Sequence, residues 1–389
     1  MYNVKLYNNI KSSALEILDG SMYKVSDAEE NPTAILVRSA KLHDLEFNPE
    51  LLCIGRAGAG VNNIPLERCA EAGIVVFNTP GANAGAVKEL AICSLFLSSR
   101  DIIGGVNWVK TIAGEGDEVP ALVEKNKSKY VGPEILGKTL GVVGLGAIGA
   151  KIANAALALG MNVIGYDPYL SVDGAWALSP MIKRVNDLDS LYAASDYISL
   201  HLPLLDSTRH LVNKDSIKKM KAGVRILNLS RAELVCDEDI ISALESEYVA
   251  SYVTDFPNAK TAGAKGVIPI PHLGASTPES EENCVTMACE EIREYIENGN
   301  IINSVNIANL STPRNGKPRV CIIHKNGDDA IAKLIAKVSS LGINVDNIAN
   351  AVGKGTNPSY VIMDINVLKD GLSSALEEVE GVIKVRVLS

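Results

Sequence analysis

Short runs of aliphatic residues alternate with segments of helical periodicity along most of the chain. The runs are continuously apolar, which is typical of strands that are buried on both faces of a parallel sheet. Strands that alternate regularly with helices predict an α/β architecture. The predicted strands are Ala34–Val37, Leu51–Ile54, Ile74–Phe77, Leu140–Val143, Val163–Tyr166, Tyr197–Leu200, Val224–Leu229 and Val249–Thr254.

The pattern changes at residues 306–318, where the sequence NIANLSTPRNGKP has two prolines, a glycine and no apolar period. These features predict a linker. Residues 319–389 then follow the order strand, helix, strand, strand, helix, strand, which predicts a ferredoxin-like βαββαβ domain. Its expected elements are Arg319–His324, Asp328–Leu341, Asn344–Val352, Ser359–Val367, Gly371–Val379 and Val382–Leu388.

Composition narrows the class of protein. The 389 residues suffice for two or three domains, and a net charge of −9 disfavours nucleic acid as a partner. Seven cysteines without a C-x-x-C pair predict reduced thiols and no metal site. The apolar run Leu90–Leu97 is too short to span a membrane, and the N-terminal sequence lacks an apolar signal segment. We therefore expect a cytoplasmic protein that binds neither nucleic acid nor membrane.

The most specific motif is Gly144-Leu-Gly146-Ala-Ile-Gly149, which follows a predicted strand and opens a predicted helix. Gly144 permits a tight turn, Gly146 lets a pyrophosphate approach the backbone, and Gly149 lets the helix pack close to the strand. The next strand ends in Asp167, whose carboxylate can accept from ribose hydroxyls and repel a 2′-phosphate. The motif predicts a site for NAD rather than NADP. The alternative is a glycine-rich turn that binds no nucleotide.

Polar side chains lie at the ends of three later apolar segments, in Asn228-Leu-Ser-Arg231, at Asp255 and in Pro-His272-Leu-Gly. In an open α/β sheet the carboxyl ends of the strands meet at the ligand crevice. Arginine binds a carboxylate bidentately, histidine removes a hydroxyl proton as hydride leaves carbon, and a carboxylate orients the imidazole. We therefore predict that Arg231, Asp255 and His272 catalyse the oxidation of an alcohol. The alternatives are a surface ion pair, a strand-end cap and a core histidine, respectively.

Together these features resemble the D-isomer-specific 2-hydroxyacid dehydrogenase family over nearly the whole chain. The resemblance implies an NAD-dependent dehydrogenase of a small D-2-hydroxy acid, with Arg231 and His272 at the positions of the family's catalytic arginine and histidine. The family's catalytic glutamate has no counterpart, because Asp255 is the only acid between Thr254 and His272. By strand alignment Asp255 matches a family aspartate near the nicotinamide, but its chemistry also suits pairing with the histidine, and both roles stay open. The motifs that carry the resemblance are V-R-S-A (37–40), G-R-A-G-x-G-V-x-N (55–63), the glycine fingerprint, N-x-x-R (228–231) and P-H-L-G-A-S-T (271–277).

The resemblance also implies a domain organisation. A flavodoxin-like substrate domain is expected at residues 1–92, completed by a returning segment at 283–305, and a Rossmann-type doubly wound NAD domain at 93–282. The expected cofactor contacts are Gly144, Gly146, Ala147, Ile148, Gly149, Asp167, Leu202, Pro203, Leu229, Ser230, Asp255, Gly274 and Ala275.

Two arginines mark the expected substrate end. Arg38 follows an apolar strand, and Arg56 opens a glycine-rich loop. Arginine side chains with loop amides can hold a phosphate or a carboxylate. By resemblance, Arg38, Arg56, Gly58 and Asn83 contact the substrate together with Arg231, which implies a phosphorylated 2-hydroxy acid. The alternative is that Arg56 is a surface arginine beside a turn.

Residues 319–389 resemble an ACT domain, a small regulatory module for amino acids. In serine-regulated relatives a histidine, an asparagine two residues later and a further asparagine bind L-serine, and these match His324, Asn326 and Asn344. Gly327-Asp-Asp329 departs from such relatives, which usually have Pro-Gly there. We expect a homodimer or homotetramer, and the alternative for this domain is a dimerisation module without a ligand.

Two other functions stay open. A glyoxylate or hydroxypyruvate reductase would use the same fold, although the paired arginines and the tail favour a phosphorylated substrate. An NAD-sensing binding protein would keep the fold without catalysis, but the presence of both Arg231 and His272 argues against that class.

Overall fold

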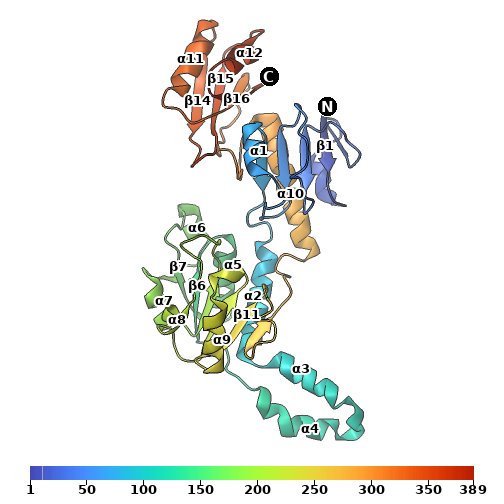
Figure 1. Cartoon of the computed structure of the whole chain (residues 1–389), viewed down its shortest axis with the longest axis vertical. Coiled ribbons are helices and arrows are strands. Elements are labelled where there is room, and N and C mark those ends of the chain that lie inside the picture. The colour runs from blue at the N-terminus through green and yellow to red at the C-terminus, as the bar shows by residue number, and fades with distance from the viewer. Residues whose placement is uncertain (11) are drawn as a thin grey trace. The chain divides into compact units, whose positions relative to one another are not determined.

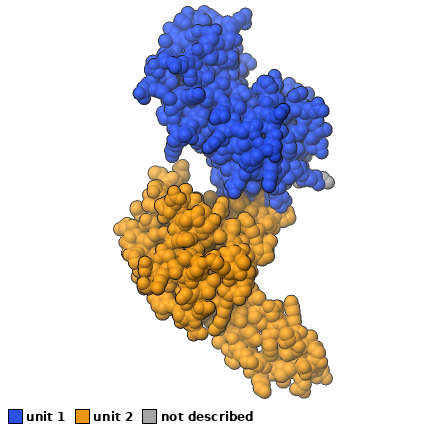
Figure 2. Space-filling model, viewed as in Figure 1, with its two compact units in different colours: residues 1–82, 281–389 blue, residues 83–280 orange. Residues whose placement is uncertain are grey.

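The structure, a computed structural model, describes residues 1–10 and 12–389 and divides into two compact units (Figures 1 and 2). Unit 1 consists of residues 1–82 and 281–389, and unit 2 of residues 83–280. The first boundary therefore differs from the expected one at residue 92, which lies inside the continuous helix α2 (Ala84–Ser99). Ala91 and Leu95 of α2 are buried in the core of unit 2, so the whole helix belongs to that unit.

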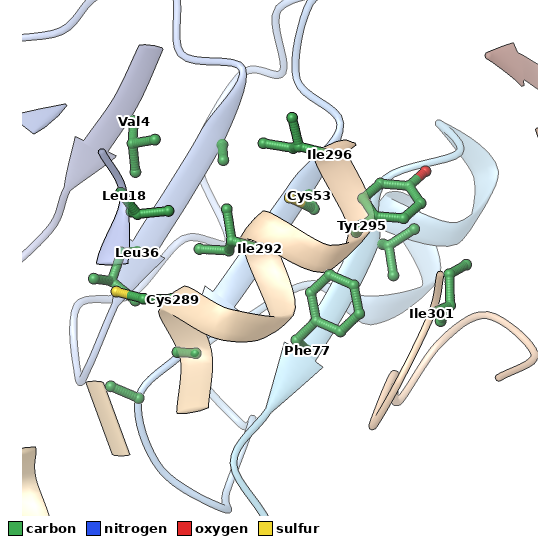
Figure 3. Packing of buried hydrophobic residues seen from close by; sticks show 14 of the residues in the cluster. Val4, Leu18, Leu36, Cys53, Phe77, Cys289, Ile292, Tyr295, Ile296 and Ile301 are labelled. Atoms are coloured by element: carbon green, nitrogen blue, oxygen red, sulfur yellow. The ribbon is translucent and has the colours of Figure 1, made fainter. Parts of the chain in front are cut away.

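Unit 1 is built on a parallel sheet of order β2-β1-β3-β4-β5. Its elements are β1 (Tyr2–Leu6), η1 (Ser13–Ile17), β2 (Tyr23–Ser26), β3 (Ala34–Val37), β4 (Cys53–Arg56), α1 (Leu66–Glu71), β5 (Val75–Asn78) and α10 (Pro278–Asn298). All four residues of β3 are buried, as its continuous apolar run predicts. Figure 3 shows Ile292 and Tyr295 of α10 among Cys53 and Phe77 of the sheet, so the returning helix supplies one side of the core.

Unit 2 is built on a longer parallel sheet of order β12-β11-β10-β9-β6-β7-β8, and the expected doubly wound fold is confirmed. Its strands are β6 (Thr139–Val143), β7 (Asn162–Tyr166), β8 (Lys183–Arg184), β9 (Tyr197–Leu200), β10 (Val224–Asn228), β11 (Val249–Thr254) and β12 (Val267–Pro269). Besides α2, its helices are α3 (Ile102–Thr111), η2 (Ala113–Glu118), α4 (Val119–Asn126), η3 (Lys127–Tyr130), α5 (Ala147–Ala158), α6 (Val172–Trp176), α7 (Leu188–Ala194), α8 (Lys214–Ile217), η4 (Ala232–Leu234) and α9 (Asp237–Glu245). The strand order reverses between β6 and β9, which is where such sheets bind ligands.

The C-terminal part of unit 1 has the predicted ferredoxin-like order, with an antiparallel sheet β14-β15-β13-β16. Its elements are β13 (Arg319–His324), α11 (Ala330–Ser340), β14 (Val345–Ala351), β15 (Ser359–Ile365), α12 (Leu372–Glu377) and β16 (Val382–Leu388). One face of this sheet packs on α11 and α12 through residues such as Ile322, Met363 and Leu334.

The other face of the tail sheet packs on the rest of unit 1. Cys321 and Tyr360 of the tail lie in the same hydrophobic cluster as Tyr295 of α10. Arg319 is fully buried, with its Nε 2.7 Å from Asp364 Oδ1. The guanidinium also donates to the carbonyls of residues 298, 312 and 313. Residues 306–318 are therefore irregular, as expected of a linker, but are held against the tail by a buried arginine.

Glu291 of α10 is a buried acid that the expected chemistry does not use. Glu291 is only 5% exposed, and its Oε1 accepts a hydrogen bond from Asn303 Nδ2 at 2.7 Å. Asn303 begins a segment that pairs with the edge strand β5, where Val305 N donates to Val76 O. Burial raises the pKa of the Glu291 carboxyl to about 8.

Replacing Glu291 with Gln should therefore stabilise unit 1 in a pH-dependent way. In the wild type, the unfolded chain releases this proton near pH 4.5 while the folded chain keeps it to about pH 8. The free energy of unfolding consequently falls as pH rises through that window. We expect the Glu291→Gln variant to match the wild type at about pH 4 and to exceed it by a few kcal/mol at about pH 8, since one pKa unit corresponds to about 1.4 kcal/mol. Thermal unfolding at several pH values measures this, with the exposed neighbour Glu290→Gln as control. A difference that does not change with pH would contradict the assignment.

Candidate active site

The glycine fingerprint forms an open backbone turn between β6 and α5. Gly144 has φ 90°, a conformation that favours glycine, and a Cβ on Gly149 would lie 1.9 Å from Gly144 O. A Cβ on Gly146 would meet nothing within 4 Å, so this residue borders open space. Asp167, at the end of β7, accepts from Leu145 N at 2.8 Å and thereby fixes the turn. The loop, the N-terminus of α5 and the carboxylate thus lie together, as a dinucleotide requires.

The end of β10 is organised by Asn228, whose role the sequence did not reveal. Asn228 is fully buried, and its Nδ2 donates to Arg231 O at 2.8 Å and to Tyr252 Oη at 3.2 Å. Ser230 Oγ donates to Leu200 O at 2.7 Å, which ties this turn to the end of β9. The Arg231 side chain is exposed, and its Nη1 donates to Ser230 O at 2.6 Å. An amide at the end of an apolar strand, three residues before an arginine, is the signal that marks this positioning residue.

Asp255 directly follows β11, and His272 lies just beyond the end of β12. Asp255 is only 2% exposed, and its Oδ1 has no hydrogen-bond partner among the described residues. Burial raises the pKa of the Asp255 carboxyl, while the charges of His272 and, more weakly, Arg231 oppose that rise. The structure thus brings all three predicted catalytic residues into one electrostatic cluster in unit 2. Phe256, which the sequence did not single out, packs on the His272 ring with centroids 4.5 Å apart.

His201 lies near the glycine turn, and its environment makes it a weak base. Its Nε2 is 2.7 Å from Ser199 Oγ, and burial lowers the pKa of its imidazole to about 3. His272, by contrast, is exposed to solvent.

The remaining predicted cofactor contacts occupy loops at the same ends of the strands in unit 2. Leu202 and Pro203 follow β9, and Leu229 follows β10. Gly274 and Ala275 follow β12, and a Cβ on Gly274 would lie 3.4 Å from Asp255 Oδ2.

The predicted substrate residues are divided between the units. In unit 1, Gly58 has φ 136°, and Arg56 lies so close that a Cβ on Gly58 would clash with its guanidinium. Thr79 Oγ1 accepts from Gly58 N at 2.7 Å, and burial lowers the pKa of Arg56. Arg38 pairs with Glu281 at 2.5 Å on the surface of the same unit. Asn83 belongs to unit 2, where it occupies the N-cap position of α2 without a capping hydrogen bond from its side chain.

The predicted effector residues lie at two ends of the tail sheet. His324 ends β13 beside Ser359, and Asn326 Nδ2 donates to Gly353 O at 3.1 Å. Ser359 Oγ donates to Asn326 Oδ1, so both ends of this amide are already bonded. Asn344 precedes β14, at the end of the sheet where β14 pairs with Ile365. One chain therefore does not bring the three residues together.

Other kinds of site are not evident in the part of the chain that the structure describes. All seven cysteines are free. No group of side chains within residues 1–10 and 12–389 has the composition of a metal site. In the same residues no helix combines the length and the apolar character that crossing a bilayer demands.

Comparison with known proteins identifies the family. Residues 99–274 match the model of the D-isomer specific 2-hydroxyacid dehydrogenase, NAD binding domain. A hydroxypyruvate reductase of Thermotoga maritima is 38% identical over 261 residues, which are 64% of this chain and 78% of that protein. The chain belongs to the D-isomer specific 2-hydroxyacid dehydrogenase family. Its NAD-binding domain lies in unit 2, where the glycine turn and Asp167 are found.

Two further relatives are phosphoglycerate dehydrogenases. The protein of Methanocaldococcus jannaschii is 33% identical over 279 residues, which cover 70% of this chain and 51% of that protein. The NAD+-bound crystal structure from Entamoeba histolytica shares 25% identity and a TM-score of 0.58, covering 78% of this chain and 98% of that one. The chain spans about half the length of the first curated phosphoglycerate dehydrogenases that it matches.

Replacing Asp167 with Ala should change the cofactor preference of this dehydrogenase family member. The variant loses the charge that repels a 2′-phosphate, so the ratio of kcat/KM for NADP to that for NAD should rise by at least about tenfold. NAD binding should also weaken, because Asp167 no longer holds Leu145 N. Steady-state kinetics with both cofactors measures the ratio, and the exposed acid Asp173→Ala is the control. An unchanged ratio would remove Asp167 from the ribose site.

Proposed function

We propose that the protein oxidises D-3-phosphoglycerate to 3-phosphohydroxypyruvate with NAD, the first step of L-serine biosynthesis. The observation that carries this proposal is the cluster of Arg231, Asp255 and His272 at the carboxyl ends of β10, β11 and β12, in the unit that holds the dinucleotide turn. The phosphoglycerate dehydrogenases among the relatives support the choice of substrate.

The proposed mechanism divides the reaction among these side chains. NAD, when bound, supplies the hydride acceptor. The Arg231 guanidinium holds the substrate carboxylate through two hydrogen bonds. The His272 imidazole accepts the proton of the C2 hydroxyl as the C2–H bond gives up its hydride, so that a carbonyl forms and one proton is left on the histidine.

For Asp255 the electrostatics favour one of its two open roles. The charge of His272 is the largest influence that keeps the Asp255 carboxyl ionised against the cost of its burial. A carboxylate beside the His272 imidazole suits the role of the missing glutamate, which is to orient the ring. We therefore assign Asp255 to the histidine, as a positioning and stabilising carboxylate.

Arg56 is the residue that we assign to the substrate phosphate. Its Nε is buried without a hydrogen-bond partner among the described residues, and it lies over the backbone of Gly58. A half-buried guanidinium whose Nε donor has no partner is suited to a phosphate oxygen. Arg38, which Glu281 already neutralises, contributes less charge.

The second candidate function is hydroxypyruvate reduction, which the Thermotoga maritima relative favours. D-3-phosphoglycerate and D-glycerate differ only in the phosphate, so the ratio of their kcat/KM values distinguishes the two functions. The proposal predicts a preference for the phosphorylated acid of at least about a hundredfold, the worth of one or two charged hydrogen bonds. A preference for glycerate and hydroxypyruvate would support the second candidate instead.

We also propose that the protein is a homo-oligomer that pairs through the arm formed by α3 and α4. In Figures 1 and 2 this arm projects from the rest of unit 2. Neither helix buries any residue, and Ile103, Val106 and Val109 are 40–50% exposed. An apolar stripe without a core of its own is typical of a surface that a second subunit covers.

L-serine at millimolar or lower concentration should slow turnover if the tail is a regulatory module. Because Asn344 lies at the other end of the sheet from His324 and Asn326, two tails must supply one site. Serine then inhibits only if it binds one conformation better, and a coupling of about 1–3 kcal/mol suffices. Asn344→Ala should relieve inhibition without changing kcat, and titration of serine against both proteins measures this. If serine leaves the wild type unaffected, the tail serves assembly alone.

A further inference from the structure

The 169–181 segment, which follows Asp167, exposes large apolar side chains beside the dinucleotide turn. Tyr169, Val172, Trp176 and Met181 are each between 70% and 91% exposed. The inner side of the same segment packs on the core of unit 2, through Leu170 among others. The four exposed residues therefore do not hold the segment against the core. Large apolar side chains held in water at one place mark a binding surface.

The segment is held in place at both ends. At its start, Asp167 Oδ1 accepts from Tyr169 N at 2.8 Å. Near its end, Asn154 of α5 donates to Ala177 O at 2.8 Å and accepts from Ser179 N at 2.8 Å. Trp176 is the last residue of α6, which lies at the end of the sheet beyond β7 in Figure 1. Trp176 is therefore 85% exposed although hydrogen bonds hold the segment that carries it.

Two adjoining clefts connect this tryptophan to the dinucleotide turn. The first, of about 440 Å³, extends from Gly146 and Ala147 at the N-terminus of α5 to Asp167. The second, of about 570 Å³, extends from Asp167 to Trp176 and Arg184. Both volumes are in the range of small-molecule sites. Since Asp167 lines both clefts, a ligand with its pyrophosphate at the N-terminus of α5 and its ribose at Asp167 can reach the second cleft with its base.

We propose that the adenine base of the dinucleotide stacks on the indole of Trp176. The inference rests on the NAD site of the proposed function and adds to it the residue that recognises the base. A purine offers a flat π-face to an aromatic ring, and each such stack contributes substantially to affinity. Arg184, which lines the same cleft, has donors for the ring nitrogens of the base. Stacking would also bury the most exposed aromatic surface of α6.

Tryptophan fluorescence tests the proposal without turnover, because the chain has only two tryptophans. Trp108 lies in α3, packed on Tyr130 at 5.8 Å, far along the chain from the clefts. In Trp108→Phe, which leaves Trp176 as the only emitter, saturating ADP-ribose or AMP should quench the emission, and nicotinamide mononucleotide should not. In Trp176→Phe the same ligands should leave the emission unchanged. Calorimetry should show that Trp176→Ala weakens ADP-ribose binding by about five- to one hundredfold, while nicotinamide mononucleotide binds as before.

Four results would overturn the proposal. If ADP-ribose binds to Trp108→Phe without changing its emission, or binds to Trp176→Ala within twofold of the wild type, the stacking is wrong but the NAD site stands. If ADP-ribose does not bind to the wild type at all, the dinucleotide site fails as well. If the emission of Trp176 depends on protein concentration and not on ADP-ribose, contact between copies of the chain covers the segment instead.

Discussion

The His272→Ala variant should lose about two to four decades in kcat, which is the usual worth of a general base. His272 is exposed in the turn after β12, its ring packs on Phe256, and its charge acts on the buried Asp255. None of these contacts involves the glycine turn, so the affinity for NAD should change little. Steady-state turnover and calorimetry with NAD measure the two effects separately.

The control for this substitution is His43→Ala, because His43 is an exposed histidine of unit 1 that no part of the mechanism uses. It should turn over like the wild type. If His272→Ala itself retains turnover within about tenfold of the wild type, another group takes the proton. His201 is poorly suited to that task, since burial lowers the pKa of its imidazole to about 3.

Arg231→Lys should lower kcat/KM by about two to three decades for every 2-hydroxy acid, because lysine keeps the charge but cannot form the bidentate pair. The backbone of residue 231 is held by Asn228 Nδ2, which the substitution leaves intact. The loss should therefore come from the side chain alone. Arg209→Lys, an exposed arginine of the same unit, is the matched control. An unaffected Arg231→Lys variant would mean that another residue holds the substrate carboxylate.

The elements that the sequence predicted best are those with strong apolar runs between polar residues. Val249–Thr254, Arg319–His324 and Val382–Leu388 have the predicted bounds, because each run ends where turn residues begin. Strands such as Tyr23–Ser26, which is half exposed and short, produce no such run. The arm of α3 and α4 has no buried residue and hence no apolar face turned to a core of its own.

The docking of the tail shows a second limit of sequence patterns. Arginine is rarely buried, so a pattern that assigns charged residues to the surface places Arg319 there. Its partner Asp364 is distant in the sequence, and only the folded sheet brings the two within 2.7 Å. In the same way, the sequence places Asn228 and Asp255 at strand ends, but the burial of both residues and the hydrogen bonds of Asn228 depend on neighbouring strands.

The most direct test of the account is the formation of NADH by the purified chain of residues 1–389 with NAD and D-3-phosphoglycerate, followed by the rise in nicotinamide absorbance. The account predicts NADH formation with the D-isomer, none with the L-isomer, and loss of the signal in His272→Ala. The absence of NADH with every D-2-hydroxy acid, in a protein that calorimetry shows to bind NAD, would contradict it and leave an NAD-binding protein without dehydrogenase activity.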